Sequence, residues 1–185
     1  MDLEWIEIRG GVCRFGDSGR AAVVPTLWWT STPITYGQLG RARPGFGARV
    51  PVTGISQAEA VAIAGQLGGR LPRSVEWEWM AAGPQRRRWP WGEDPWRPGL
   101  ANLRDGGHGA PTPVDTHPAG ATAEGVLDVA GNVWEWTASK ALGDGAIIRG
   151  GSYAARPLYA QCTFVNAAPT ELRSRGIGLR LVRQP

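Results

Sequence analysis

Two segments of the chain are predicted to form helices, and the first of them places its apolar residues on one side. In the first, over residues 56–69, Ser56 is followed three positions later by Glu59, the pattern of a capping box. A pair of glycines ends it. The second covers residues 74–83 and begins after a leucine–proline step, since the residue before proline avoids the helical region. A threonine–proline pair predicts a third, short helix over residues 32–40.

Shorter apolar runs predict strands. Residues 5–8 alternate apolar and polar side chains. The chain is expected to turn back at two glycines, so that residues 12–15 pair with residues 5–8. Residues 21–29 form an apolar run interrupted by Pro25, which favours a sheet edge or a bulge. The remaining expected strands cover residues 126–128, 133–137, 147–149 and 177–182.

Long irregular segments separate these elements. Residues 41–50 are expected to be a loop, and residues 84–125 are rich in glycine and proline. A loop of the second length inside a compact domain is either disordered or held down by side chains. Trp89, Trp91 and Trp96 favour the second possibility.

The segment 131–136, Gly-Asn-Val-Trp-Glu-Trp, is an apolar strand that carries two polar side chains. Trp134 and Trp136 are expected to be buried, so replacing Trp134 by alanine should cost about 3–5 kcal/mol of stability. Asn132 and Glu135 cannot be buried without partners. Glu135 therefore needs a cation, backbone N–H groups or solvent at a strand end.

Composition fits one domain over residues 1–185, because this length supports a single hydrophobic core. The chain has 10 Trp, 27 Gly and 15 Pro, a mixture typical of short strands and many turns around aromatic side chains. No apolar run is long enough to cross a membrane, and the N-terminus lacks a signal-peptide pattern, so a cytoplasmic location is the default. Cys13 and Cys162 match no metal or redox spacing and are expected to be free, buried thiols.

Charge is distributed unevenly. Residues 146–185 hold six arginines against one glutamate, or +5, so the net charge of +4 leaves −1 for the rest of the chain. Lys140 is the only lysine, which is typical of a GC-rich genome or of a thermostable protein from a hot habitat. The arginines alternate with apolar residues and form no cluster, which favours strand-edge solvation over nucleic-acid binding.

A series of short motifs carries a family resemblance. They are, in order, Arg70-Leu71-Pro72, Glu76-Trp77-Glu78, Trp89-Pro90-Trp91-Gly92, Ala101-Asn102, Thr112-Pro113-Val114-Asp115, residues 131–136, Arg149-Gly150-Gly151-Ser152 and Gly178-Leu179-Arg180. Together they resemble the formylglycine-generating-enzyme (sulfatase-modifying factor) family. The resemblance implies an α+β, C-type-lectin-like fold with small mixed or antiparallel sheets, two main helices and much irregular chain.

The same resemblance argues against the family's chemistry. Its enzymes carry a copper-binding cysteine pair after the Gly-Gly-Ser motif, and the matching positions here are Ala155 and Ala160. Alanine offers copper no ligand, so neither copper nor enzymatic activity is expected. Related sulfoxide synthases need an iron-binding histidine set, and this chain has only His108 and His117. A formylglycine-type oxidase remains the alternative.

The C-terminus resembles a second group, the variable proteins diversified by retroelements on this same scaffold. Their variable region begins near Arg-Gly-Gly-Ser and ends like residues 178–183, which implies a variable region over residues 149–185. The chain would then be a non-catalytic display protein that binds a protein or other macromolecular ligand. The implied contact residues are Tyr153, Ala154, Ala155, Arg156, Leu158, Tyr159, Gln161, Phe164, Val165, Ala168, Glu171, Ser174 and Arg175.

Two alternatives accompany this reading. Tyr153, Leu158 and Phe164 could instead be ordinary core residues, and the chain could be a non-catalytic relative with fixed specificity. The resemblance also implies a structural calcium ion. Its ligands would be Asp128, the carbonyls of Gly131 and Val133, and Glu135, all of them oxygen donors. Capture of Glu135 by backbone N–H groups or by an arginine is the competing interpretation.

Overall fold

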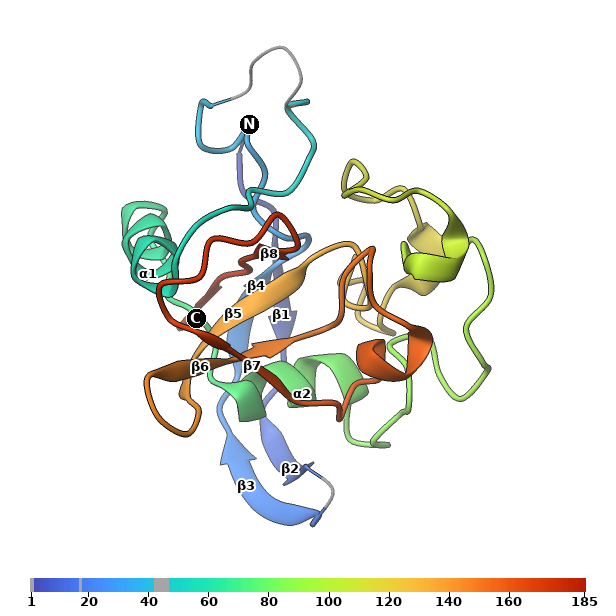
Figure 1. The fold of residues 1–185 in the computed structure, drawn as a ribbon. Helices are drawn as coiled ribbons and strands as arrows, with labels where there is room; N and C mark the ends of the chain where they lie inside the picture. The colour runs from blue at the N-terminus through green and yellow to red at the C-terminus, as the bar shows by residue number, and fades with distance from the viewer. Residues whose placement is uncertain (1, 17, 42–46) are drawn as a thin grey trace.

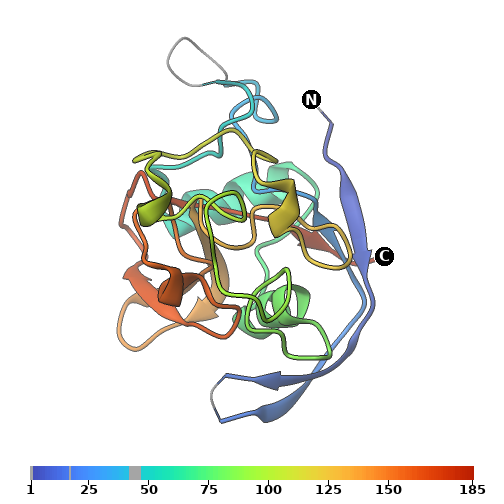
Figure 2. The same cartoon turned by 90° about the vertical axis from the view of Figure 1, so that its right-hand side faces the viewer.

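Two helices and three small sheets make up the fold in a computed structural model that describes residues 2–16, 18–41 and 47–185 (Figure 1). In the first sheet, β4 (Leu27–Thr30) lies between β1 (Trp5–Ile8) and β9 (Val182–Arg183), and both pairings are antiparallel. This sheet joins the two ends of the chain, which lie on the same side of the molecule in Figure 2.

The second sheet is built from strands of the C-terminal half of the chain. Its order is β7 (Asn166–Pro169), β6 (Gly145–Arg149), β5 (Trp134–Lys140) and β8 (Ile177–Gly178). The β5–β8 pairing is parallel and the other two are antiparallel. The expected α+β fold with small mixed and antiparallel sheets is therefore confirmed.

A hairpin of β2 (Gly11–Phe15) and β3 (Arg20–Val24) extends away from the body of the molecule (Figures 1 and 2). The expected pairing of residues 12–15 with residues 5–8 is wrong, because β2 pairs with β3 and β1 pairs with β4. The break at Pro25 is real. Proline lacks the N–H that a continuous ladder needs, and the run 21–29 divides there into strands of two different sheets.

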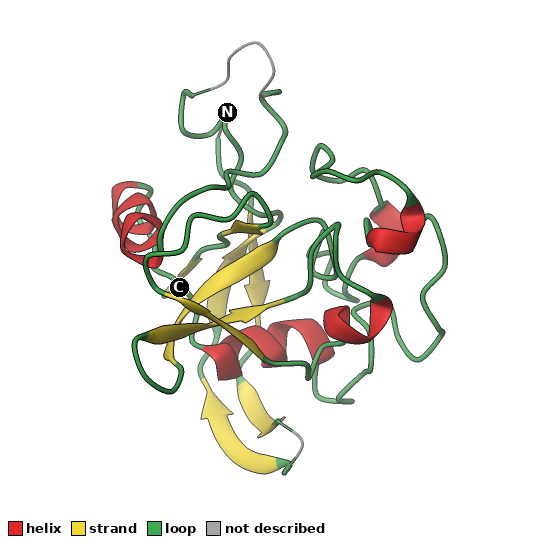
Figure 3. Cartoon of the chain, in the orientation of Figure 1, coloured by secondary structure: helices red, strands yellow, loops and turns green. Residues whose placement is uncertain are grey.

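Both main helices form where the sequence predicts them (Figure 3). α1 (Gln57–Gln66) begins with the expected capping box, in which the Glu59 N–H donates to Ser56 Oγ over 3.3 Å and the Ser56 N–H donates to Glu59 Oε2 over 2.8 Å. In α2 (Ser74–Ala82) the Glu76 carboxylate likewise accepts from the Arg73 N–H, at 2.7 Å, but the side chain of the N-cap residue makes no capping hydrogen bond.

The predicted helix over residues 32–40 is wrong. The Ile34 N–H donates to the Leu179 carbonyl and the Ile34 carbonyl accepts from Val52, so Ile34 is extended between two other segments. These pairings outweigh the local preference of a threonine–proline start, which is a weak signal when tertiary contacts compete. Part of the expected 41–50 loop, residues 42–46, lies outside the described residues.

Two strand predictions also need correction. Residues 126–128 form no strand: Asp128 has a φ of 53°, a left-handed conformation that a strand cannot contain. The expected strand over 177–182 is two short strands, β8 and β9, in different sheets. The chain crosses between the sheets at Arg180, whose side chain is fully buried.

The irregular segment 84–125 is held down as expected, but only partly by tryptophans. Trp89 stacks on Trp91 with ring centroids 5.2 Å apart. The Trp96 indole N–H donates to the Ala101 carbonyl at 3.1 Å. The third anchor is Asn132, whose side-chain amide accepts from the Thr112 N–H at 2.9 Å and donates to the Thr112 carbonyl at 3.2 Å. This pairing satisfies the buried amide and attaches the irregular segment to the start of β5.

Cys13 and Cys162 are free and buried, as expected. Burial raises the pKa of the Cys13 thiol to about 11, and it raises the pKa of Cys162 as well. None of the helices that the structure describes is long and apolar enough to cross a bilayer.

Candidate ligand-binding site

Glu135 has an arginine partner, one of the alternatives that the sequence left open. Its Oε1 accepts from Arg180 Nε and Nη2 at 3.1 and 3.0 Å, and its Oε2 accepts from the Trp77 indole N–H at 2.7 Å. All three side chains are fully buried. The carboxylate between two tryptophans in the sequence is thus neutralised inside the core by a residue 45 positions away.

A second buried ion pair holds the start of the C-terminal segment. Arg149 Nη2 donates to Glu78 Oε2 at 2.8 Å and to the Cys162 carbonyl at 2.7 Å. The guanidinium also lies over the Trp77 ring, 5.1 Å from its centroid. Because Arg149 bonds to helix α2 and to the backbone thirteen residues further on, it ties residues 149 and 162 to each other and to the scaffold.

The glycines after Arg149 let the chain pass close to neighbouring backbone. Gly150 has a φ of 96°, and a Cβ there would lie 2.7 Å from the Val129 carbonyl oxygen. The turn that follows exposes Ala154 and leads into η3 (Pro157–Ala160). The two ends of the segment are therefore fixed while the chain between them reaches the surface.

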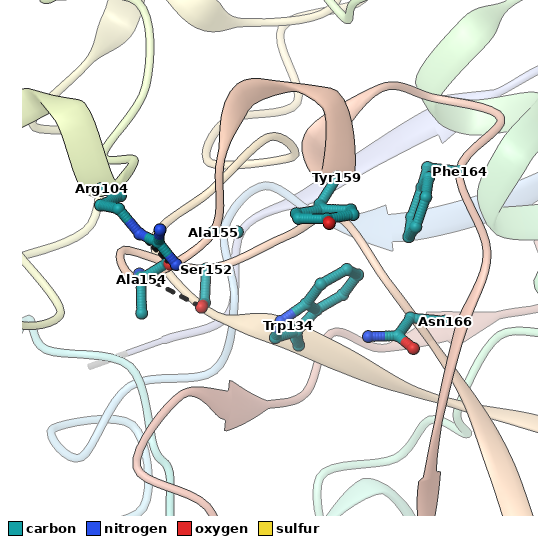
Figure 4. A pocket seen from close by; sticks show the side chains of 8 residues that line it. All are labelled: Arg104, Trp134, Ser152, Ala154, Ala155, Tyr159, Phe164 and Asn166. Atoms are coloured by element: carbon teal, nitrogen blue, oxygen red, sulfur yellow. Dashed lines mark hydrogen bonds between the residues drawn. The ribbon is translucent and has the colours of Figure 1, made fainter.

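This segment forms most of a pocket of about 400 Å³ (Figure 4). The pocket is lined by Arg104, Trp134, Ser152, Ala154, Ala155, Tyr159, Phe164 and Asn166. Its volume lies at the lower end of the range for small-molecule sites.

Three aromatic side chains form one end of the pocket. The Tyr159 and Phe164 rings meet edge to face with centroids 5.0 Å apart, and Phe164 lies 6.4 Å from Trp134. Trp134 is only partly buried, unlike the fully buried Trp136. The expectation that both tryptophans belong to the core is therefore corrected: Trp134 lies at the beginning of β5, where the sheet meets the pocket.

The other end of the pocket is polar. The Arg104 N–H donates to the Ala155 carbonyl at 3.0 Å, and Arg104 Nε donates to the Ala154 carbonyl at 3.1 Å. The Ala154 N–H in turn donates to Ser152 Oγ at 3.3 Å (Figure 4). Arg104 belongs to η1 (Arg104–Gly106), so the irregular segment and the C-terminal segment meet at this end.

The thirteen residues expected to contact ligand mostly reach the surface. Seven are exposed: Ala154, Arg156, Leu158, Tyr159, Val165, Glu171 and Arg175. Four are partly buried: Tyr153, Gln161, Phe164 and Ser174. Ala155 and Ala168 are buried, Ala155 beneath the pocket and Ala168 within β7. Of the three residues that could have been core, none is fully buried, and Leu158 is 57% exposed.

These residues line separate hollows. Ala154, Ala155, Tyr159 and Phe164 line the pocket described above. Leu158, Gln161 and Val165 line a second hollow that shares Phe164 with it. Tyr153 and Arg175 line a third, of about 530 Å³. Ala168 borders a shallow hollow beside β7, and Arg156, Glu171 and Ser174 line none of these four.

Sequence reasoning missed half of the pocket lining: Arg104, Trp134, Ser152 and Asn166. No sequence pattern indicated Arg104, because it lies about fifty residues before the pocket residues Ala154 and Ala155 in the chain. Trp134 was assigned to the core by its apolar character alone. Ser152 belongs to the Gly-Gly-Ser motif, and Asn166 lies within the region 149–185. Their positions in the sequence could therefore have marked both as pocket residues.

Ala155 and Ala160, the counterparts of the copper-binding cysteines, are both buried in one apolar cluster with Leu103 and Ala130. The rings of His108 and His117 meet edge to face, with centroids 5.6 Å apart. Within the described residues, no three His, Cys, Asp or Glu side chains are grouped so that they could hold a metal ion.

The calcium set implied by the resemblance fits poorly. Both carboxylate oxygens of Glu135 already accept hydrogen bonds, and the Arg180 guanidinium occupies the side where a cation would bind. Asp128 Oδ2 accepts from the Asp115 N–H at 2.7 Å. A calcium ion there would have to displace a buried guanidinium. Glu135 is therefore assigned to Arg180, and calcium binding through Asp128, Gly131 and Val133 stays a prediction.

Asp128 gives a prediction about pH. Burial raises its pKa to about 6, against the opposing effects of the Asp115 N–H and the charge of Arg180. The folded carboxyl thus binds its proton more tightly than the unfolded one. Its contribution to the unfolding free energy should fall by about 3 kcal/mol as the pH rises from about 4 to above 6.

Asp128→Asn should remove this loss and raise stability at pH 7 by about 1–3 kcal/mol relative to the wild type. Asparagine also tolerates the left-handed conformation of this position and can accept the Asp115 hydrogen bond. Denaturant unfolding in EDTA at several pH values measures the difference between the two proteins. A constant loss of stability in the variant at every pH would contradict the prediction.

Comparison with known proteins agrees with the motifs. Residues 21–185 match the model of the sulfatase-modifying factor enzyme 1-like domain. Hercynine oxygenase of Mycobacterium tuberculosis is 35% identical over 88% of this chain and 43% of its own length. The inactive C-alpha-formylglycine-generating enzyme 2 of Bos taurus is 35% identical over 69% of this chain and 47% of its length. The chain therefore spans less than half the length of these curated relatives.

Among solved structures, variable protein 1 of Treponema denticola superposes with a TM-score of 0.83 over 99% of this chain and 95% of its own, at 16% identity. That likeness shows a shared fold. The family match over most of the chain identifies the class of protein. The chain belongs to the sulfatase-modifying factor (formylglycine-generating-enzyme-like) family.

Proposed function

We propose that this chain is a non-catalytic ligand-binding protein whose C-terminal segment, residues 149–185, supplies the contact surface. The observation that carries the proposal is the pocket of Figure 4, in which the C-terminal segment supplies six of the eight lining residues. Buried ion pairs of Arg149 and Arg180 fix the two ends of this segment. Side chains between such anchors can change at little cost to the fold.

Residue types on this surface suit recognition. Tyr159 and Phe164 offer rigid apolar area with few rotatable bonds, and Arg156 and Arg175 offer adaptable polar contacts. Because the exposed residues follow no strand or helix period, the surface has the assorted character expected of a diversified display protein. A fixed-specificity relative is the version of this function without diversification.

Diversification by a retroelement is tested by the DNA that flanks the gene. We expect a near-copy of the codons for residues 149–185, differing chiefly at adenines, beside a reverse transcriptase gene. The differences should fall on the thirteen contact positions. Differences that fall equally on Arg180, Leu179 and Leu181, which are fully buried, would contradict the proposal. Finding no near-copy would overturn the diversification and leave fixed specificity.

The alternative is an enzyme, and the names of the relatives favour it: one is a hercynine oxygenase and others are formylglycine-generating enzymes. Against it stand the alanines at positions 155 and 160, which give copper no ligand. A sulfatase peptide incubated with this chain, copper and oxygen should keep its cysteine unchanged in mass spectrometry. Conversion of that cysteine to formylglycine would establish the enzyme instead.

A further inference from the structure

We propose that the pocket of Figure 4 binds an aromatic carboxylate, with the ring among Trp134, Tyr159 and Phe164 and the carboxylate on Arg104. This inference rests on the proposed function and names the chemistry of its ligand. The same chemistry could come from a free aryl acid or from an aromatic residue next to Asp or Glu in a protein. The two sources share the ring and the anionic group that the pocket would contact.

The pocket has an apolar end and a polar end. In Figure 4 the rings of Trp134, Tyr159 and Phe164 lie together on one side, and Arg104, Ser152 and Ala154 lie on the other. Phe164 contacts both other rings. A planar ring placed at this end would meet aromatic edges and faces, which favour offset or edge-to-face packing.

The polar end of the pocket carries a positive charge. Arg104 is the only charged side chain among the eight that line the pocket, and no carboxylate is among them. Its Nε and its backbone N–H are bonded to the Ala154 and Ala155 carbonyls, so the guanidinium is held in place. Its two terminal nitrogens have no hydrogen-bond or ion-pair partner among the described residues. A carboxylate is a planar anion that such a fork can bind with two parallel hydrogen bonds.

Two further side chains, Ser152 and Asn166, offer hydrogen-bond donors to the pocket. Ser152 Oγ accepts from the Ala154 N–H, which leaves the hydroxyl hydrogen free to donate at the polar end. At the aromatic end, Asn166 Oδ1 accepts from the Ala167 N–H, and the amide N–H groups point to no partner among the described residues. A polar substituent on the ring could accept from Asn166. The terminal N–H groups of Arg104 and the amide N–H groups of Asn166 can only donate, and Arg104 is the one charge among the lining side chains, which favours an anionic ligand over a cationic one.

Three probes of graded chemistry test the inference on the whole chain. Phenylacetate carries ring and carboxylate, phenethylamine carries the same ring with a cation, and acetate lacks the ring. Phenylacetate should shift the Trp134 indole and Arg104 Nε–H NMR signals at millimolar concentration, as expected for about ten non-hydrogen atoms. Phenethylamine should bind at least about tenfold more weakly, and acetate should cause no shift of the Trp134 signal.

Matched variants separate the two ends of the pocket. Arg104→Gln should weaken phenylacetate about tenfold without changing phenethylamine. Arg97→Gln, at an exposed arginine outside the pocket, should change neither. Trp134→Ala should weaken both ring compounds. A peptide with adjacent Asp and Tyr, acetylated and amidated, distinguishes the sources, since binding tighter than that of phenylacetate favours a protein ligand.

Equal binding of phenethylamine and phenylacetate would overturn the anion preference while leaving a ligand site in place. If no ring compound shifts the signals of the pocket, the inference fails altogether. Neither result decides the proposed function, which depends on the flanking DNA and the peptide assay.

Discussion

Replacing Arg180 by methionine is expected to lower the free energy of unfolding by about 3–5 kcal/mol. Its fully buried guanidinium makes hydrogen bonds to Glu135 and to the carbonyls of Thr30, Ser31 and Leu127. Methionine has a similar volume but no donor, so the Glu135 carboxylate would keep only the Trp77 indole as a partner. Urea denaturation at neutral pH measures the loss.

Two further variants show whether the unpaired charge is the cause. Arg175→Met, at an exposed arginine of the same segment, should stay within about 0.5 kcal/mol of the wild type. Adding Glu135→Leu to Arg180→Met should recover part of the loss, since an apolar pair can replace a buried ion pair at little cost. A double variant no more stable than Arg180→Met alone would instead locate the loss in the three carbonyls.

Trp136→Ala is expected to cost about 3–5 kcal/mol and to exceed the cost of Trp134→Ala. Trp136 is fully buried among Ile34, Ile148 and Leu179, and its indole N–H donates to the Ile55 carbonyl at 3.1 Å. Alanine would leave a large cavity and an unpaired carbonyl. Thermal and urea unfolding of the two variants measure the difference.

Trp134 should behave as a pocket residue. Because one side of its ring borders the pocket, Trp134→Ala should cost only about 1–2 kcal/mol, and its larger effect should be on ligand binding. Trp134→Phe should retain most of the stability. Equal losses for Trp134→Ala and Trp136→Ala would return Trp134 to the core and contradict the assignment of the pocket.

Elements with strong local signals could be predicted and those without could not. The capping box at Ser56 and Glu59 is a local interaction that forms wherever the helix forms, and α1 begins there. The strand predicted at residues 126–128 failed because Asp128 adopts a left-handed backbone, and its carboxylate accepts a hydrogen bond from Asp115 instead of continuing a sheet. The segment at Ile34 is extended because Leu179 and Val52 pair with it, and neither is visible within a local window.

The candidate site divides in the same way. The two end motifs predict a contact surface over residues 149–185, and most of the expected contact residues do reach the surface. Arg104 could not be found, because it reaches the pocket only through hydrogen bonds to Ala154 and Ala155. Whether a residue such as Ala168 faces solvent depends on strand pairing, and the β6–β7 pairing buries it.

By itself, the sequence determined the family, the two helices, the apolar strand around Trp136 and the need of Glu135 for a partner. Those follow from motif order, from periodicity and from the cost of burying a lone carboxylate. Only the tertiary structure decided that the partner is Arg180, that Trp134 borders a pocket and that Arg104 completes it. Each of these pairs residues at least about thirty positions apart, and contacts of that range are set by packing of the whole chain.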